Sequence, residues 1–244
     1  GTVLHRRAVD DRMRDVFVNP SDIGGRYSAL SFFGLVPAAL MGADLDRLLA
    51  AARQMDGACR AARVADNPGL TLGAFMAAGA RSGRDKLTLL LPAKLAALGL
   101  WIEQLVAEST GKHGKGIVPI AGETGGEAPW SADRVAVAVT IGPDGPDAGR
   151  LAAARAAGTP ILSLQMSDVY ALGAEFLRWE IGTAAAGFLL EINPFDEPNV
   201  QQAKDATKAL LESFNRQRQL PFGEPHGGVE GARLTLSQTA LDAL

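Results

Sequence analysis

Short apolar runs alternate with longer alanine- and leucine-rich segments along most of the chain. Several runs are apolar at consecutive positions, which is typical of strands buried on both faces of a parallel sheet. The predicted strands are 15–18, 86–91, 116–120, 134–141 and 160–164. The predicted helices are 28–41, 44–64, 71–80, 95–110, 148–157, 172–190 and 200–218. This alternation indicates an α/β fold in which helices cover a mostly parallel sheet.

Local signals refine this outline. The longest uncharged stretch, 27–43, is shorter than the ~20 apolar residues that span a bilayer, and it predicts a buried helix. Asp44 is suited to capping the next helix, because its carboxylate can accept from the free amides of the first turn.

Turn-rich sequence marks the loops and the end of the main domain. Residues 122–133 predict a loop between strands, and 220–231 predict a linker after the last long helix. We therefore expect one domain over 1–220, followed by a linker and partial tail over 221–244 that holds a short strand and a helical turn.

Composition narrows the class of protein. With 24 basic and 27 acidic residues among 244, a net charge of −3 and 47% hydrophobic residues, the chain is expected to fold and not to bind nucleic acid. Its single cysteine, Cys59, excludes an intramolecular disulfide and predicts a small apolar helix residue in a reducing, cytoplasmic setting. The first residues lack the apolar core of a secretory leader, and a start without Met inside an apparent helix indicates a fragment.

Generic catalytic motifs are absent. Around the Gly-Lys pair at 111–112, Val106 occupies the position of a required P-loop glycine, and His113 replaces the required Ser or Thr. No GxGxxG or GxSxG motif occurs. His5 and His226 are far from His113 in the sequence, without the spacing of a helical metal site, so we expect no metal.

Three local clusters carry candidate chemistry. In GGR, two glycines and Arg26 could receive an oxyanion, although taken alone they are more typical of an ordinary turn with a solvated arginine. Gln104 and Glu108 share one helical face, which could also be plain surface. Lys204 follows the turn INPFDEP and could be a solvated helical lysine.

The three clusters are more informative together and in this order than any one of them alone. GGRYSALSFFG, QLVAESTGKHGKG and GFLLEINPFDEPNVQQAK together resemble the signature segments of glucose-6-phosphate isomerase. The segment LGAEFLRWEIGTAAAG further resembles the isomerase half of fused transaldolase/glucose-6-phosphate isomerases, and the resemblance covers about 15–240. It implies the sugar-isomerase (SIS) fold, a three-layer αβα sandwich, here as the C-terminal copy. It also implies cofactor-free interconversion of glucose 6-phosphate and fructose 6-phosphate in glycolysis and gluconeogenesis.

The resemblance assigns catalytic roles to three residues. Glu108 matches the general base that moves a proton between C2 and C1 through a cis-enediol. Such a base should be shielded enough for its pKa to approach the working pH. Arg26 matches the cation that stabilises the enediolate, and Lys204 matches a lysine of ring opening.

Substrate-binding roles fall on three further positions. Gly25 matches a backbone contact and Gln104 a substrate-binding glutamine. Glu197 stands in the substrate-binding position where the family usually has Gln, and Gln201 stands where Glu is common. A carboxylate beside a phosphosugar would repel it or acquire a raised pKa.

Other family features have no counterpart in this sequence. The ring-opening histidine motif and the phosphate-binding Ser/Thr loop of the first SIS copy are not matched. The implied partners are therefore a hexose 6-phosphate, a missing N-terminal SIS half or transaldolase domain, and further copies in a homo-oligomer. A non-catalytic SIS module that binds or senses a phosphosugar remains an alternative, as does an isomerase acting on mannose or another phosphosugar.

Overall fold

The computed structural model describes residues 2–123, 130–219 and 223–243. The chain divides into two compact units, Gly1–Asp196 and Glu197–Leu244. This division falls before the last long helix, earlier than the boundary expected at 220. The assignment of 1–220 to an SIS domain stays a prediction, because compactness alone does not define a family domain.

A parallel sheet forms the centre of the first unit. Its strands are β1 (Lys86–Leu90), β2 (Val118–Ile120), β3 (Arg134–Ile141) and β4 (Ile161–Met166). They lie in the order β2-β1-β3-β4, and every pair of neighbours is parallel. The predicted α/β class with a mostly parallel sheet is confirmed.

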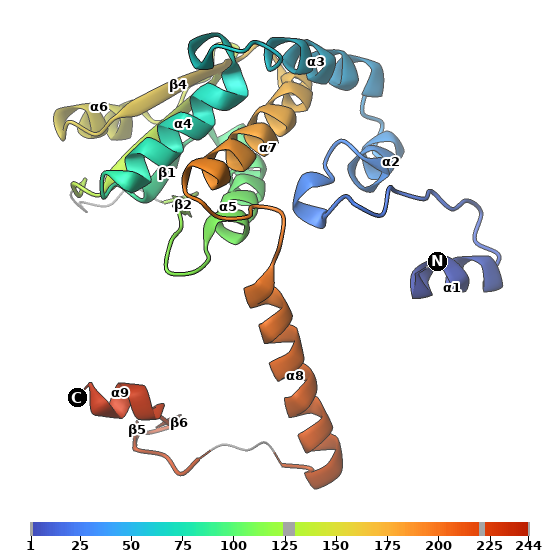
Figure 1. Cartoon of the computed structure of the whole chain (residues 1–244), viewed down its shortest axis with the longest axis vertical. Coiled ribbons are helices and arrows are strands. Elements are labelled where there is room, and N and C mark those ends of the chain that lie inside the picture. The colour runs from blue at the N-terminus through green and yellow to red at the C-terminus, as the bar shows by residue number, and fades with distance from the viewer. Residues whose placement is uncertain (1, 124–129, 220–222, 244) are drawn as a thin grey trace. The chain divides into compact units, whose positions relative to one another are not determined.

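Helices cover both faces of this sheet. The helices that follow the N-terminal region are α3 (Leu45–Ala58), α4 (Pro68–Arg81), α5 (Ala96–Thr110), α6 (Ala148–Ala156) and α7 (Leu172–Leu189). Side chains of α4, α5 and α7 share the large core with one sheet face, and α6 packs on the smaller core of the other. Figure 1 shows α4 and α7 side by side in front of the strands. The layers are therefore helix, sheet and helix, as predicted.

Strand residues alternate between these two cores. Leu87 and Val135 are opposite each other in the register and belong to the large core, whereas Leu90 and Ala138 belong to the smaller one. Since successive side chains of a strand point to opposite faces, strands with two buried faces need consecutive apolar residues. This explains why the apolar runs identified β1 and β3.

Glycines let α7 lie close to its neighbours. A Cβ at Gly73 of α4 would come within 2.5 Å of the Gly182 carbonyl oxygen of α7. Alanine at position 73 would therefore force the two helices apart. Close packing fixes α7, and with it the turn that follows, against the rest of the first unit.

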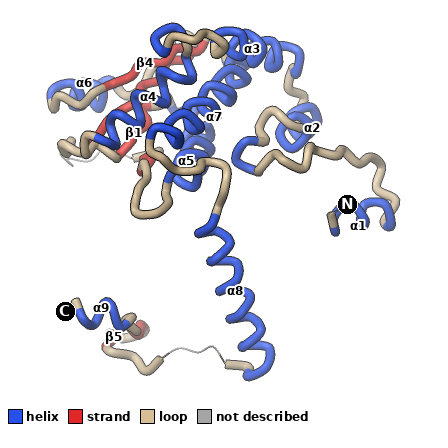
Figure 2. The backbone as a smooth tube through the Cα atoms, in the orientation of Figure 1, coloured by secondary structure: helices blue, strands red, loops and turns tan. Residues whose placement is uncertain are grey.

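The strand predicted at 15–18 is wrong. These residues lie in a loop between α1 (Val3–Asp10) and the 3₁₀ turn η1 (Gly25–Tyr27), as Figure 2 shows. Phe17 packs against Phe32, with ring centroids 5.7 Å apart and ring planes tilted by 51°, instead of entering the sheet. Four residues of strand-like composition cannot form a strand without a pairing neighbour.

The buried helix predicted over 27–43 is also wrong in part. Helix α2 (Phe32–Leu40) begins later than expected, because the Ser31 hydroxyl accepts from the Phe33 amide and caps it there. No residue of α2 is buried, and Phe33 and Leu40 are 70% and 84% exposed. The uncharged sequence predicted a buried helix, but the described residues cover α2 only in part.

The start of the next helix, α3, was predicted correctly, but its end was not. Asp44 caps α3, its carboxylate accepting from the Arg47 amide at 3.1 Å. Cys59 ends that helix and is half-buried. The predicted extension of this helix to residue 64 fails, since α3 stops at Ala58.

The second unit consists of α8 (Pro198–Gln217), an antiparallel pair β5 (Gly227–Val229) and β6 (Ala232–Leu234), and α9 (Gln238–Asp242). The final strand and helical turn were predicted, whereas β5 was assigned to the linker because of its glycines. Parts of the two predicted loops, 124–129 and 220–222, lie outside the described residues. Among the described helices, none combines the length and the apolar character needed to cross a membrane.

Candidate functional site

Arg26 is buried at the turn η1, with 6% of its surface exposed. Its Nη1 donates to the Ser109 hydroxyl at 2.9 Å and to the Pro194 carbonyl at 3.4 Å, and its Nη2 donates to the Asp196 carbonyl at 3.1 Å. The guanidinium is thus held by the end of α5 and by the turn that follows α7. A buried cation held by several oxygens has a fixed direction, which a solvated arginine lacks.

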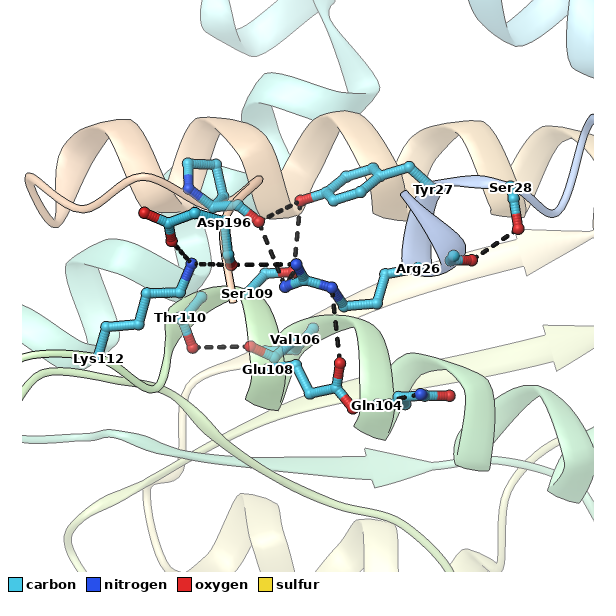
Figure 3. Close-up of polar contacts among 12 residues, drawn as sticks. Arg26, Tyr27, Ser28, Gln104, Val106, Glu108, Ser109, Thr110, Lys112 and Asp196 are labelled. Atoms are coloured by element: carbon cyan, nitrogen blue, oxygen red, sulfur yellow. Dashed lines mark hydrogen bonds and ion pairs between the residues drawn. The ribbon is translucent and has the colours of Figure 1, made fainter. Parts of the chain in front are cut away.

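Glu108 lies beside this guanidinium. Its Oε2 is 3.6 Å from Arg26 Nε, and its Oε1 accepts from Gln104 Nε2 at 3.2 Å. Figure 3 shows Arg26 between Glu108 on one side and Tyr27 and Asp196 on the other. The structure therefore brings Arg26, Gln104 and Glu108 together, although 83 residues separate Arg26 from the α5 residue Ser109.

The Glu108 carboxylate is only partly shielded, with 35% of its side chain exposed. A carboxylate with one oxygen near a guanidinium and the other on an amide has a set orientation and an open side. Such a group can reach a proton of a bound molecule.

Gly25 precedes Arg26 and borders an open space. A Cβ built on it would meet no atom within 4 Å, and its φ is outside the left-handed region. Gly25 lines a cavity of about 630 Å³ together with Trp101 and Phe176. Neither packing nor a left-handed backbone conformation requires glycine at position 25. Its role as a backbone contact for a sugar stays a prediction.

Sequence reasoning missed two polar neighbours of Arg26, namely Tyr27 and Ser109. The Tyr27 hydroxyl lies 3.4 Å from both the Ser109 hydroxyl and the Pro194 carbonyl, and burial raises the pKa of Tyr27. Tyr27 directly follows Arg26 in the segment GGRYSALSFFG, and Ser109 directly follows Glu108 in QLVAESTGKHGKG. Their position in these motifs was the available signal.

Lys112 was also missed, since it was considered only as part of a failed P-loop. It is 3% exposed and its Nζ donates to the carbonyls of Asn193 and Asp196, and it pairs with the Asp196 carboxylate. The hydrogen bond from Lys112 lowers the pKa of Asp196. A buried ammonium is tolerated because oxygens surround it.

Glu180 of α7 is a buried carboxyl near this cluster. Burial raises its pKa to about 7, and its charge also raises the pKa of Tyr27. Its Oε1 is buried without a hydrogen-bond partner in the part of the chain that the structure describes. A second carboxyl, separate from Glu108, therefore lies close enough to Tyr27 to affect its pKa.

Glu180→Gln should change how stability depends on pH. Glu180 has a folded pKa near 7 against an ordinary value of 4.5, so the folded state binds more protons in this window. The free energy of unfolding therefore falls as pH rises from about 4.5 to 7, by at most about 3 kcal/mol. Urea unfolding from pH 5 to pH 8 should show this loss in the parent chain and not in Glu180→Gln. The exposed Glu191→Gln is the control, and parallel profiles for parent and Glu180→Gln would refute the burial argument.

Lys204 and Glu197 belong to the second unit. Glu197 is exposed at the start of α8, and Lys204 is exposed on that helix beside Thr207 and Lys208. Their relation to Arg26 and Glu108 stays a prediction. Within the described residues, no group of three or more His, Cys, Asp or Glu side chains could hold a metal ion.

Sequence comparison connects this arrangement to known proteins. Glucose-6-phosphate isomerase of Heliobacterium modesticaldum is 29% identical over 84% of this chain and 55% of its own length. The enzyme of Symbiobacterium thermophilum is 32% identical over 80% of this chain and 52% of its own length. The chain is related by sequence to the glucose-6-phosphate isomerases. It spans about half the length of these relatives, and no family model matches it.

Solved structures support the same fold. A glucose-6-phosphate isomerase from Chlamydia trachomatis aligns with a TM-score of 0.65 over 87% of this chain and 51% of its own, at 17% identity. A hypothetical protein from Thermus thermophilus aligns with a TM-score of 0.71 and 26% identity over 86% of this chain and 60% of its own. The resemblance to glucose-6-phosphate isomerase inferred from the sequence is confirmed, whereas fusion to a transaldolase stays a prediction.

Proposed function

We propose that this chain carries the proton-transfer centre of a glucose-6-phosphate isomerase. The observation that carries the proposal is the 3.6 Å approach of Glu108 to the buried Arg26 guanidinium, in a chain related to these enzymes. Because the chain spans about half the length of these relatives, the proposal assigns the activity to a longer natural polypeptide that would contain this chain.

Glu108 would act as the base of an aldose–ketose isomerisation. Its carboxylate takes the proton from C2 of the open-chain aldose, the C–H electron pair forms the C1–C2 double bond, and the carbonyl oxygen on C1 gains the charge. Return of the proton to C1, with transfer of the hydroxyl proton from O2 to O1, completes the ketose. Hydrogen bonding to Gln104 would keep the carboxylate aimed at the two carbons.

Arg26 would stabilise the cis-enediolate. Its guanidinium is already fixed by Ser109 and by the carbonyls of Pro194 and Asp196, so no reorganisation is needed when charge develops. An interaction that strengthens only as the proton leaves lowers the barrier more than it strengthens substrate binding. The open backbone at Gly25 would admit the sugar beside this cation.

Further contacts are part of the same proposal. Lys204 would assist ring opening and Glu197 would contact the sugar. The phosphate would be bound by residues outside this sequence, in an N-terminal SIS half or in another copy of a homo-oligomer. A cytoplasmic location fits a chain with one cysteine.

A coupled assay tests the function. Fructose 6-phosphate is supplied, and formation of glucose 6-phosphate is followed with a dehydrogenase, for this chain alone and for the natural polypeptide that contains it. We expect turnover in the longer polypeptide and little in the chain alone. Binding of fructose 6-phosphate without turnover by the longer polypeptide would instead favour a non-catalytic phosphosugar-binding module. If mannose 6-phosphate were turned over faster than fructose 6-phosphate, mannose 6-phosphate would be assigned as the substrate instead.

A further inference from the structure

The turn 193–196 is held by two buried cations. Arg26 donates to the Pro194 and Asp196 carbonyls, and Lys112 donates to the Asn193 and Asp196 carbonyls. The Asp196 carbonyl is therefore shared between a guanidinium and an ammonium. Any movement of this oxygen changes the contacts of both.

The contacts of Lys112 are stronger than those of an ordinary surface lysine. Only 2% of its side chain is exposed, and besides the two carbonyls it pairs with the Asp196 carboxylate. A buried ammonium without such partners would carry a large desolvation penalty, so these contacts hold Lys112 and the turn 193–196 together. Removing Lys112 should therefore release the turn. The carbonyls that orient Arg26 belong to that same turn.

We propose that Lys112 is a positioning residue that sets the direction of the Arg26 guanidinium through the turn 193–196. Its effect on catalysis rests on the proposed function, but its effect on Arg26 does not. Without Lys112, the Pro194 and Asp196 carbonyls lose their second anchor, and Arg26 Nη1 and Nη2 lose fixed acceptors. The guanidinium then no longer holds one angle relative to Glu108.

The same loop provides a matched control. Lys115 also donates to a backbone carbonyl, that of Leu190 at 2.8 Å, and lies 3.6 Å from the Glu191 carboxylate. Its side chain is 45% exposed, and its two partners, Leu190 and Glu191, precede the turn 193–196. Lys115→Met removes an equal charge from the loop while leaving the turn 193–196 anchored.

The test is the nuclear magnetic resonance signal of the Arg26 Nε–H group in this chain, assigned by its loss in Arg26→Lys. We expect Lys112→Met to shift this signal and to speed its hydrogen exchange about tenfold or more, because local opening becomes easier. Lys115→Met should leave it unchanged. An unchanged Arg26 signal in a folded Lys112→Met would overturn the proposal.

Two variants keep the test decisive if Lys112→Met unfolds. Asp196→Asn retains the carbonyls and should shift the Arg26 signal only slightly, whereas Lys112→Arg keeps the charge and should preserve most of the protection. Exchange of the Arg26 Nε–H in a folded Lys112→Arg as fast as in an unprotected, solvent-exposed arginine would contradict positioning through a cation. In the active polypeptide, Lys112→Met should lower kcat about tenfold with little change in KM. Absence of activity in every polypeptide would overturn the proposed function and leave the resonance test intact.

Discussion

Replacing Glu108 by Gln will lower isomerase turnover of the natural polypeptide about 10²–10⁴-fold, the range that positioned proton transfer contributes. Glutamine has nearly the same shape, and its amide oxygen can still accept from Gln104, which now donates to the carboxylate. Because the amide cannot take a proton from carbon, kcat should fall while the KM for fructose 6-phosphate changes little. The coupled assay measures both.

Glu103→Gln is the control for this substitution. Position 103 lies on the same helix, α5, but five residues before Glu108, which turns its side chain about 140° away around the helix axis. This variant should keep parental turnover and the parental circular dichroism spectrum. Turnover within twofold of the parent in a folded Glu108→Gln would remove Glu108 from its role.

Arg26→Lys will lower turnover about 10²–10³-fold, comparable to the loss of one donor that stabilises an oxyanion. A lysine has one nitrogen in place of three, so it cannot reach Ser109, both carbonyls and the neighbourhood of Glu108 together. The stabilisation lost belongs to the enediolate, and kcat should fall more than substrate affinity. Thermal unfolding should also show a loss of about 1–3 kcal/mol, since buried carbonyls lose donors.

Arg60→Lys separates this effect from a general arginine effect. Arg60 pairs with Asp56 at 2.8 Å on the surface, with 75% of its side chain exposed. Its replacement should change neither turnover nor stability measurably, because exposed ion pairs contribute little. If Arg26→Lys matched Arg60→Lys in kcat, the cation would have no part in the reaction.

The fold was predictable where burial follows a simple period. The strand prediction for 134–141 coincides with β3, because both faces of that strand are buried over 135–139 and all of those positions are small and apolar. Predictions failed where contacts with distant parts of the chain determine the conformation or the burial of a segment. Four strand-like residues at 15–18 have no pairing neighbour, and α2 is exposed although its sequence is uncharged.

The candidate site was predictable only through family resemblance. The spacing of Gln104 and Glu108 showed a shared helical face, but no periodicity relates them to Arg26, which comes from a distant turn. The burial of Lys112 and Glu180 depends on which helices and turns pack around them. A lysine after a glycine and a glutamate within a helix have no local feature that predicts burial.

Exchange of the substrate's C2 proton with solvent tests the central claim most directly. The natural polypeptide is incubated with glucose 6-phosphate in D₂O, and deuterium on carbon is followed by proton nuclear magnetic resonance. A proton held by Glu108, whose carboxylate is 35% exposed, should exchange with solvent during some turnovers, so deuterium will accumulate at C2. In Glu108→Gln, the rate of deuterium incorporation should fall about 10²–10⁴-fold, in parallel with turnover. Incorporation at the parental rate by Glu108→Gln would show that another group removes the proton.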